Sequence, residues 1–275
     1  MSEIKDNTNL QKLENDVESL SKLGELLDSL GIEFDHQFLA TLRTETFQFV
    51  TLADKFNAAF SQHGWIATED ISTKLMEKAL EIFHSRGLVE SEKYLCESFD
   101  DDYFALHSHR MKALWVWKNS ERENLLRLAF EDHKNQRYHA STPVVLAQID
   151  GLAFDINKNT FFNHKKSSLI LENSVAAHET GLNTLSKISG KPRTKTQSNP
   201  IRFPYRHGIL HGRDLAYANR AVSTKSFFAL FAMRPWALRC QQSELSRQQG
   251  LDYEEIPGFT PGDLLQSIIQ EMLKS

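Results

Sequence analysis

The chain has 275 residues, 40% of them hydrophobic and 25% charged, with a formal net charge of −4. This length suits one large domain or two modest ones and allows a sizeable core. The composition is that of an ordinary folded protein, so disordered, collagen-like and low-complexity classes are excluded for the bulk of the chain.

The cysteines and the apolar runs indicate a cellular compartment. Two cysteines, Cys96 and Cys240, are too few for a disulfide scaffold and favour a reducing environment. The beginning of the sequence lacks the apolar stretch of a secretory signal. The longest apolar run, Phe227–Met233, is far shorter than the roughly 20 residues of a membrane span. We therefore expect a cytoplasmic protein with no membrane partner.

Apolar residues three or four positions apart predict helices in the first half of the chain. This spacing covers 10–30 and ends near Gly31, and it resumes over 38–60 until the break at His63-Gly64. Further helices are expected over 75–83, ending at Arg86-Gly87, and around 125–129.

The second half also has helical patterns. Pro143 is expected to open a helix over 144–156, which should be buried because it is apolar almost all round. From Pro204 to Arg239 the pattern predicts continuous helix, and a last short helix is expected over 264–273.

Residues 186–203 form the one clear linker in the sequence. They include a glycine, two prolines and several polar residues, with no periodic apolar positions. A loop of this length inside a compact domain is usually functional or disordered. Strand-like alternation is nearly absent elsewhere, so we expect an all-α protein. It would have an N-terminal helical region over 1–119 and a C-terminal helical domain over 120–275 that contains this loop.

The net charge hides a strong asymmetry. Between Lys187 and Arg239 there are eleven Lys and Arg against one acid, Asp214, so this segment carries +10 and the remaining chain −14. Such segregation points either to an anionic partner or to pairing with the chain's own acids, for example those over 90–102. The sequence alone leaves both alternatives open.

The segment 203–219 contains the residues that are the best candidates for a catalytic site. Arg206 and His211 combine a permanent cation with a group that carries protons near neutral pH. RNA cleavage without a metal needs both roles. One group moves the protons of the 2′-hydroxyl and the leaving 5′-oxygen, and the other neutralises charge that grows on the phosphate.

The spacing of these residues does not decide the function. Five positions on an α-helix place Arg206 and His211 about 140° apart, so they do not share a face. His207 and His211 do share one, and Asp214 follows a turn later, where it could orient His211. The alternative is a solvated arginine and capped histidines at the start of a helix.

The pattern Arg-His-x-x-x-His-Gly over 206–212 resembles the signature of the HEPN superfamily (higher eukaryotes and prokaryotes nucleotide-binding domains). The wider pattern, with Tyr138-His139 and 143–151 upstream, is similar to uncharacterised bacterial HEPN-like proteins. The resemblance covers approximately 120–239.

This resemblance implies a HEPN-like helical bundle that forms a homodimer, in which two motifs build one composite cleft. Many members are metal-independent endoribonucleases of phage defence or toxin–antitoxin systems, and others have lost activity and only bind. It therefore implies an endoribonuclease with Arg206, His211 and His207 as catalytic residues and without a cofactor. The alternative is a non-catalytic module that binds RNA or a partner protein, such as an antitoxin or sensor subunit.

Other residues are expected to support such a site. Asp150 lies in an otherwise apolar helix, where a carboxylate is costly unless it is paired. It could orient Arg206 or His211, or cap a neighbouring helix, while Asp214 is a second orienting candidate. The backbone of a single-stranded or looped RNA would be held by Arg202, Arg213, Lys195 and Arg137.

A metal site is not expected. His107 and His109 would point in different directions on a helix, and no further ligands stand nearby at a suitable spacing. The phenylalanines of 227–231 are assigned to the core, and Cys240 is expected to be packed.

Overall fold

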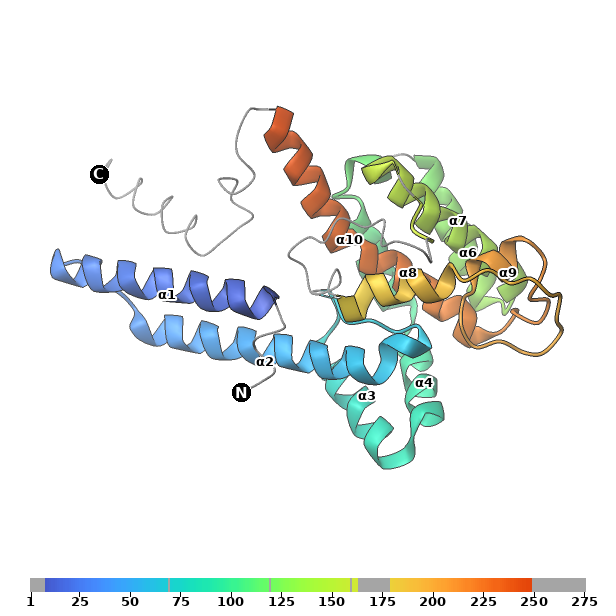
Figure 1. Ribbon diagram of the computed structural model, residues 1–275, viewed down its shortest axis with the longest axis horizontal. Helices are drawn as coiled ribbons and strands as arrows, with labels where there is room; N and C mark the ends of the chain where they lie inside the picture. Colours follow the sequence, from blue (N-terminus) through green and yellow to red (C-terminus); the bar gives the residue numbers. More distant parts are fainter. Residues whose placement is uncertain (1–7, 69, 119, 159, 163–178, 249–275) are drawn as a thin grey trace. The chain divides into compact units, whose positions relative to one another are not determined.

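The structure is a computed structural model, and it describes residues 8–68, 70–118, 120–158, 160–162 and 179–248 (Figure 1). These residues are mostly helical and contain no β-strand, apart from an isolated bridge between Gln197 and Asp214. The prediction of an all-α fold is confirmed. In this part of the chain, no helix has both the length and the apolar composition needed to cross a bilayer.

The chain divides into two compact units. The first contains Met1–Thr51 and Gln242–Ser275, and the second contains Leu52–Gln241. The expected division into 1–119 and 120–275 would therefore cut through the second unit.

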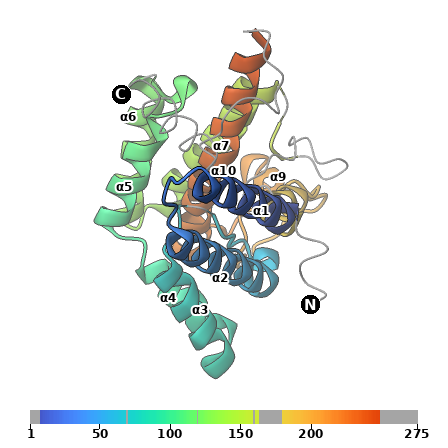
Figure 2. The ribbon, with the colours of Figure 1, turned by 90° about the vertical axis from the view of Figure 1, so that its left-hand side faces the viewer.

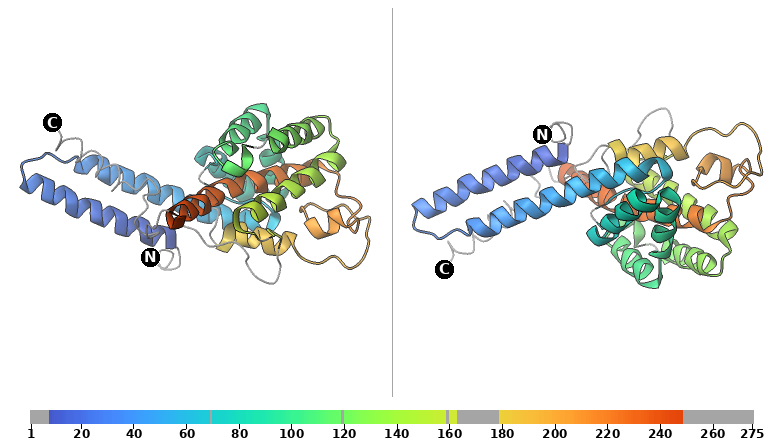
Figure 3. Two further views of the ribbon diagram at one scale, coloured as in Figure 1. Left: turned by 90° about the horizontal axis from the view of Figure 1, so that it is seen from above. Right: turned by 90° about the horizontal axis from the view of Figure 1, so that it is seen from below.

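In the first unit, α1 (Thr8–Ser29) and the beginning of α2 (His36–Phe60) run antiparallel, side by side (Figures 1 and 3). Helix α1 ends just before Gly31, as the sequence predicts, and Gly31 has a φ of 78° that favours glycine. The two helices share a small cluster of buried apolar side chains, Val17, Leu20 and Leu39, against which Phe34 packs.

The second unit contains a series of shorter helices and most of the long helix α10. Helices α3 and α4 pack as neighbours (Figure 2), as do α6 and α7. The helices are η1 (Ser61–His63), α3 (Thr73–Arg86), α4 (Leu88–Glu97), α5 (Asp101–Met111), η2 (Trp115–Trp117), α6 (Ser120–Lys134), α7 (Tyr138–Asn157), the irregular turn η3 (Glu179–Asn183), α8 (Thr184–Ser189), α9 (Arg206–Leu210) and α10 (Arg220–Gln248).

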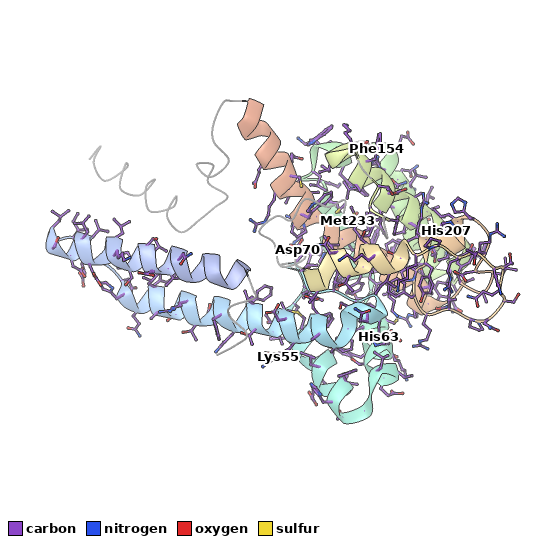
Figure 4. The ribbon with its side chains drawn as sticks, in the orientation of Figure 1. Lys55, His63, Asp70, Phe154, His207 and Met233 are labelled. Carbon is purple, nitrogen blue, oxygen red and sulfur yellow. The ribbon has the colours of Figure 1, made fainter. Side chains whose placement is uncertain are left out.

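Helix α10 supplies much of the core of the second unit. Its residues 222–233 are all buried, including Met233 (Figure 4). Phe227 packs against the ring of Phe99 at 5.1 Å between centroids, and Phe228 stacks on Tyr103 of α5 at 4.9 Å. The phenylalanines of 227–231 are therefore core residues, as predicted.

Helix α7 begins earlier than predicted, at Tyr138, with Pro143 inside it. A proline in this position cannot donate to the carbonyl of His139, four residues before it. The hydroxyl of Tyr217 donates to that carbonyl instead, at 3.0 Å. A residue distant in the sequence thus satisfies the His139 carbonyl. The prediction that Pro143 opens the helix considered only neighbouring residues and therefore placed the helix start wrongly.

The prediction of one continuous helix from Pro204 to Arg239 is also wrong. Residues 211–219 are not helical and separate α9 from α10. Gly212 leaves the helical region with a φ of 63°, and the Asn219 side chain accepts a hydrogen bond from the Val222 N–H at 3.1 Å. This bond satisfies a donor at the start of α10, so Asn219 specifies where the second helix begins.

The expected linker over 186–203 is helical at its start. Ser186 and Ser189 belong to α8, both are buried, and the Ser186 hydroxyl donates to the carbonyl of Phe161. Residues 191–203 are irregular, apart from the bridge at Gln197. The helix expected over 264–273 lies outside the described residues.

Two buried histidines predict that acid destabilises the second unit. Burial lowers the pKa of His107 and of His133 from 6.5 to about 4. The unfolded chain therefore binds more protons between these values. The free energy of unfolding should fall as pH decreases from 6.5 towards 4, by up to about 3 kcal/mol for each ring. Denaturant unfolding measured near neutral pH and near pH 5 checks this.

The variant His107→Phe separates this effect from the titration of carboxylates. Its ring can keep the stacking on Tyr103, which His107 makes at 4.1 Å, but it cannot take a proton. The loss of stability between the two pH values should be smaller in the variant than in the wild type. An equal loss in both proteins would contradict the assignment to His107.

Candidate functional site

Helix α9 presents the arginine and histidines of the predicted motif. It lies between the irregular stretches 191–205 and 211–219 and packs against α7 (Figure 3). It has only five residues, and His211 follows it as the C-terminal cap. A helix this short has little stability of its own, so its position depends on contacts with the surrounding chain.

One such contact joins Gly208 and Asp214. The Asp214 carboxylate is buried, and its Oδ2 occupies the space in which a side chain at position 208 would begin. The main-chain N–H groups of Arg213 and Asp214 donate to the Gly208 carbonyl at 2.7 and 3.0 Å. Only glycine fits at this position, and the chain folds back onto α9 there.

The partner of Asp214 is Arg193, not His211. The Arg193 side chain donates from Nε at 3.0 Å and from one terminal nitrogen at 3.1 Å, and Gln197 donates to the same carboxylate. The guanidinium also lies over the ring of Tyr205, 4.2 Å from its centroid. Asp214 therefore ties the irregular stretch to α9, and the expectation that it orients His211 is not met in this structure.

Arg206 faces α7. It donates to Asp150 Oδ2 at 2.9 Å, and its Nε is buried without a hydrogen-bond partner in the described part of the chain. Asp150 also accepts from the hydroxyl of Thr160 and from the N–H of Phe161. Of the roles left open for Asp150, the structure thus shows pairing with Arg206 together with support of the residues after α7.

A cavity of about 440 Å³ opens beside this pair. Arg206 and Asp150 line it together with a second ion pair, Arg122 with Asp155 at 2.5 Å. The exposed ring of Phe154, labelled in Figure 4, forms part of its wall. Because each guanidinium is matched by a carboxylate, the cavity has little net charge.

The two histidines lie together on another side of α9. The rings of His207 and His211 are 4.7 Å apart between centroids, and His211 is exposed. The Nδ1 of His207 accepts a hydrogen bond from the Arg193 main-chain N–H at 3.2 Å, so its Nε2 carries the proton in the neutral ring. Arg206 and His211 make no hydrogen bond with each other. The structure therefore brings the histidines together and directs the arginine to α7.

The basic segment 187–239 was expected either to bind an anionic partner or to pair with the chain's own acids, and its residues divide between paired and unpaired cations in the described part of the chain. Of the eleven Lys and Arg between Lys187 and Arg239, five form ion pairs with acids of the chain, namely Arg193, Arg202, Arg206, Lys225 and Arg234. Four others are exposed and form no ion pair with a described residue, namely Lys187, Lys191, Lys195 and Arg213.

The residues proposed to hold RNA divide in the same way. Lys195 and Arg213 are exposed cations. Arg202 instead pairs with Glu92 at 2.7 Å, and Arg137 pairs with Asp132 at 2.6 Å. Lys195 and Arg213 form no ion pair with a described residue, so they are the better candidates to hold an RNA backbone. The charge of Arg137 is matched by Asp132, whereas Arg202 and Lys225 share the single carboxylate of Glu92.

The histidines expected not to bind metal lie in different surroundings. His107 is buried against Tyr103 and Phe231, whereas His109 is exposed. Among the described residues, no group of three or more His, Cys, Asp or Glu side chains could hold a metal ion.

Comparisons with known proteins add no family to this description. No protein-family model matches the chain, and no curated protein or solved structure resembles it sufficiently to count as a match.

Arg193 and Lys225 are the principal residues of this region that the sequence analysis did not single out. Arg193 stands in the apparent linker, where nothing local indicates its buried partner Asp214. Lys225 did leave a signal, because it is a single charge within a helix whose neighbours are small or apolar. A lysine in such a place needs a buried partner, which here is Glu92 at 2.5 Å.

The tight fit at position 208 predicts that Gly208→Ala destabilises the second unit. The added methyl group overlaps the Asp214 carboxylate, and such overpacking costs about 1–3 kcal/mol or more. Gly212→Asn is the matched control, because the space around Gly212 is open and asparagine tolerates a positive φ. Chemical denaturation should show a clear loss for the first variant and a small one for the second. Equal losses would contradict the packing argument.

Proposed function

We propose that the protein is a HEPN-like endoribonuclease that cleaves RNA without a metal ion. The observation that carries this proposal is the pair of histidines on α9 and its C-terminal cap, with His211 on the surface and His207 held through Arg193. Two imidazoles side by side can supply both proton transfers of RNA cleavage. The resemblance of 206–212 to the HEPN signature supports the same chemistry.

In the proposed reaction, His211 removes the proton of a 2′-hydroxyl. The 2′-oxygen attacks the adjacent phosphorus, and the bond from phosphorus to the 5′-oxygen breaks. His207 exchanges the hydrogen bond at its Nδ1 for a proton, and the resulting imidazolium gives its Nε2 proton to that leaving oxygen. The products are a 2′,3′-cyclic phosphate and a 5′-hydroxyl end.

Arg206 would stabilise the charge that develops on the phosphate in a homodimer. Within one chain it is paired with Asp150 and makes no hydrogen bond with His211. A second copy placed across a two-fold axis could present its own motif to the same cleft, so that the arginine of one chain serves the histidines of the other. The role of Arg206 therefore depends on dimer formation.

A second candidate function is a non-catalytic module that binds RNA or a partner protein, such as an antitoxin or a subunit of a defence system. One observation favours it: the Arg206 guanidinium is already neutralised by Asp150. An arginine held by an ion pair in this way can stabilise the contact between α9 and α7 without a catalytic role. Measurements of cleavage separate the two functions.

We expect RNA cleavage to persist in excess EDTA and to fall in His211→Ala by roughly 10²–10⁴-fold, the usual effect of losing a general acid or base. His109→Ala is the matched control, because His109 is an exposed histidine on α5. Cleavage of a fluorescent single-stranded RNA, with analysis of the product ends, provides the measurement. A requirement for Mg²⁺, or full activity of His211→Ala, would contradict the proposal.

The variants at Arg206 need a control for folding, because removing this residue leaves Asp150 without its ion-pair partner. Arg206→Ala should lose about 10²–10³-fold in rate. Asp150→Asn breaks the same ion pair and keeps the arginine, so it should retain most of the activity if the arginine acts on the phosphate. Mixing His211→Ala with Arg206→Ala protein should restore part of the activity if the two chains share one cleft.

Affinity for single-stranded RNA should fall with salt, because cations that neutralise phosphates release counterions. The double variant Lys195→Gln, Arg213→Gln should weaken binding and reduce the logarithmic salt slope by about 1 to 1.5. Arg127→Gln is the control, since Arg127 is an exposed arginine that already pairs with Glu131. Fluorescence anisotropy over a salt series measures both slopes. An unchanged slope in the double variant would remove these residues from the interface.

A further inference from the structure

The second unit has a second cavity of about 340 Å³, and neither His207 nor His211 lines it. It is bounded by the end of the irregular stretch before α9 and by residues of α4 and α10. Three cations, Arg193, Arg202 and Lys225, and one carboxylate, Glu92, line it. His63, labelled in Figure 4, stands at its wall.

Two of the residues that line this cavity, Lys225 and Glu92, form a buried ion pair. Lys225 donates to Glu92 Oε1 at 2.5 Å, and both side chains are almost fully buried. Trp65 donates to the same oxygen at 3.3 Å, while Arg202 donates to Oε2 from two nitrogens at 3.0 and 2.7 Å. Burial by itself would raise the pKa of the Glu92 carboxyl, but Lys225 and Arg202 hold it below its ordinary value.

The charges of the cavity do not balance. Glu92 is shared by two cations, Arg202 and Lys225, so one positive charge remains in excess. Arg193 is matched by Asp214, which lies behind it and does not line the cavity. The walls therefore carry a net positive charge in a partly enclosed space, where Coulomb interactions are stronger than in water.

Each cation also keeps a donor that no described residue uses. Arg202 binds Glu92 through Nε and one terminal nitrogen, and Arg193 binds Asp214 through the equivalent pair, so each has a second terminal nitrogen left. Lys225 donates two hydrogen bonds, to Glu92 and to the Arg202 carbonyl, whereas an ammonium has three donors. Three cationic groups with unused donors thus meet at one cavity.

We propose that this cavity binds the phosphate group of a small phosphomonoester. Donor groups of three cationic side chains line the cavity, and a phosphomonoester has three terminal oxygens to accept from them, whereas a carboxylate offers only two. The excess positive charge favours an anion, and the volume suits a small molecule. The side chains of Arg202, Lys225 and Glu92 take no part in the proposed cleavage, so the two proposals can be tested separately.

Isothermal titration calorimetry with inorganic phosphate and with glycerol 3-phosphate tests this site, with glycerol and acetate as neutral and carboxylate controls at matched ionic strength. We expect saturable binding of both phosphates that is at least about tenfold tighter than that of acetate. Arg202→Gln should weaken phosphate binding by about tenfold or more, the effect of losing one charge-assisted contact. Its side chain is 58% exposed, so the variant should fold.

Arg127→Gln is the matched control for Arg202→Gln, because it also removes an arginine that pairs with a glutamate. It should bind phosphate like the wild type. Three results would each overturn the proposal: no saturable binding of either phosphate at about 10 mM, equal affinity for acetate, or unchanged phosphate affinity in an Arg202→Gln protein whose thermal unfolding is cooperative.

Discussion

The buried carboxylate of Glu92 constrains the second unit more than any other single group that we describe. It is almost fully buried, and its oxygens are satisfied because α10 brings Lys225, the irregular stretch brings Arg202, and Trp65 donates a further hydrogen bond. Breaking the buried pair by removing Lys225 would typically cost about 3–5 kcal/mol, since the buried charge of Glu92 would keep only the more exposed Arg202 as its partner. The cluster therefore fixes α4, α10 and the chain before α9 in one arrangement.

The position of α9 follows from this arrangement and determines what its residues can do. The Arg193–Asp214 pair holds both flanks of the short helix, and the Arg193 main chain also contacts His207. Arg206 is bound to α7 through Asp150. The motif residues are thus distributed over two sides of one helical turn, and within a single chain only the histidines lie together. A catalytic site that uses all of them requires a second chain.

The helical spacing predicted the fold class and several helix ends, because that spacing reflects local geometry. It failed where distant residues intervene: Tyr217 makes Pro143 acceptable inside α7, and Asn219 starts a new helix where the pattern predicted a continuous one. The same holds for the site. Pairing of Asp150 with Arg206 was among the roles foreseen, because a carboxylate in an apolar helix needs a partner. The partner of Asp214 was not foreseen, because Arg193 stands 21 positions away in a stretch without any periodic pattern.

The hydrogen bond from Tyr217 to the His139 carbonyl links two positions that a sequence alone treats as independent. While position 143 is proline, the carbonyl at 139 lacks its usual donor four residues along the helix, and the tyrosine hydroxyl donates to it instead. If another residue replaced the proline, its N–H could satisfy the carbonyl, and position 217 would be released from this requirement. Across diverged relatives, proline at 143 and tyrosine at 217 should therefore be gained and lost together. Such paired substitution would reveal the contact between positions 139 and 217, which the local sequence pattern of neither segment predicts.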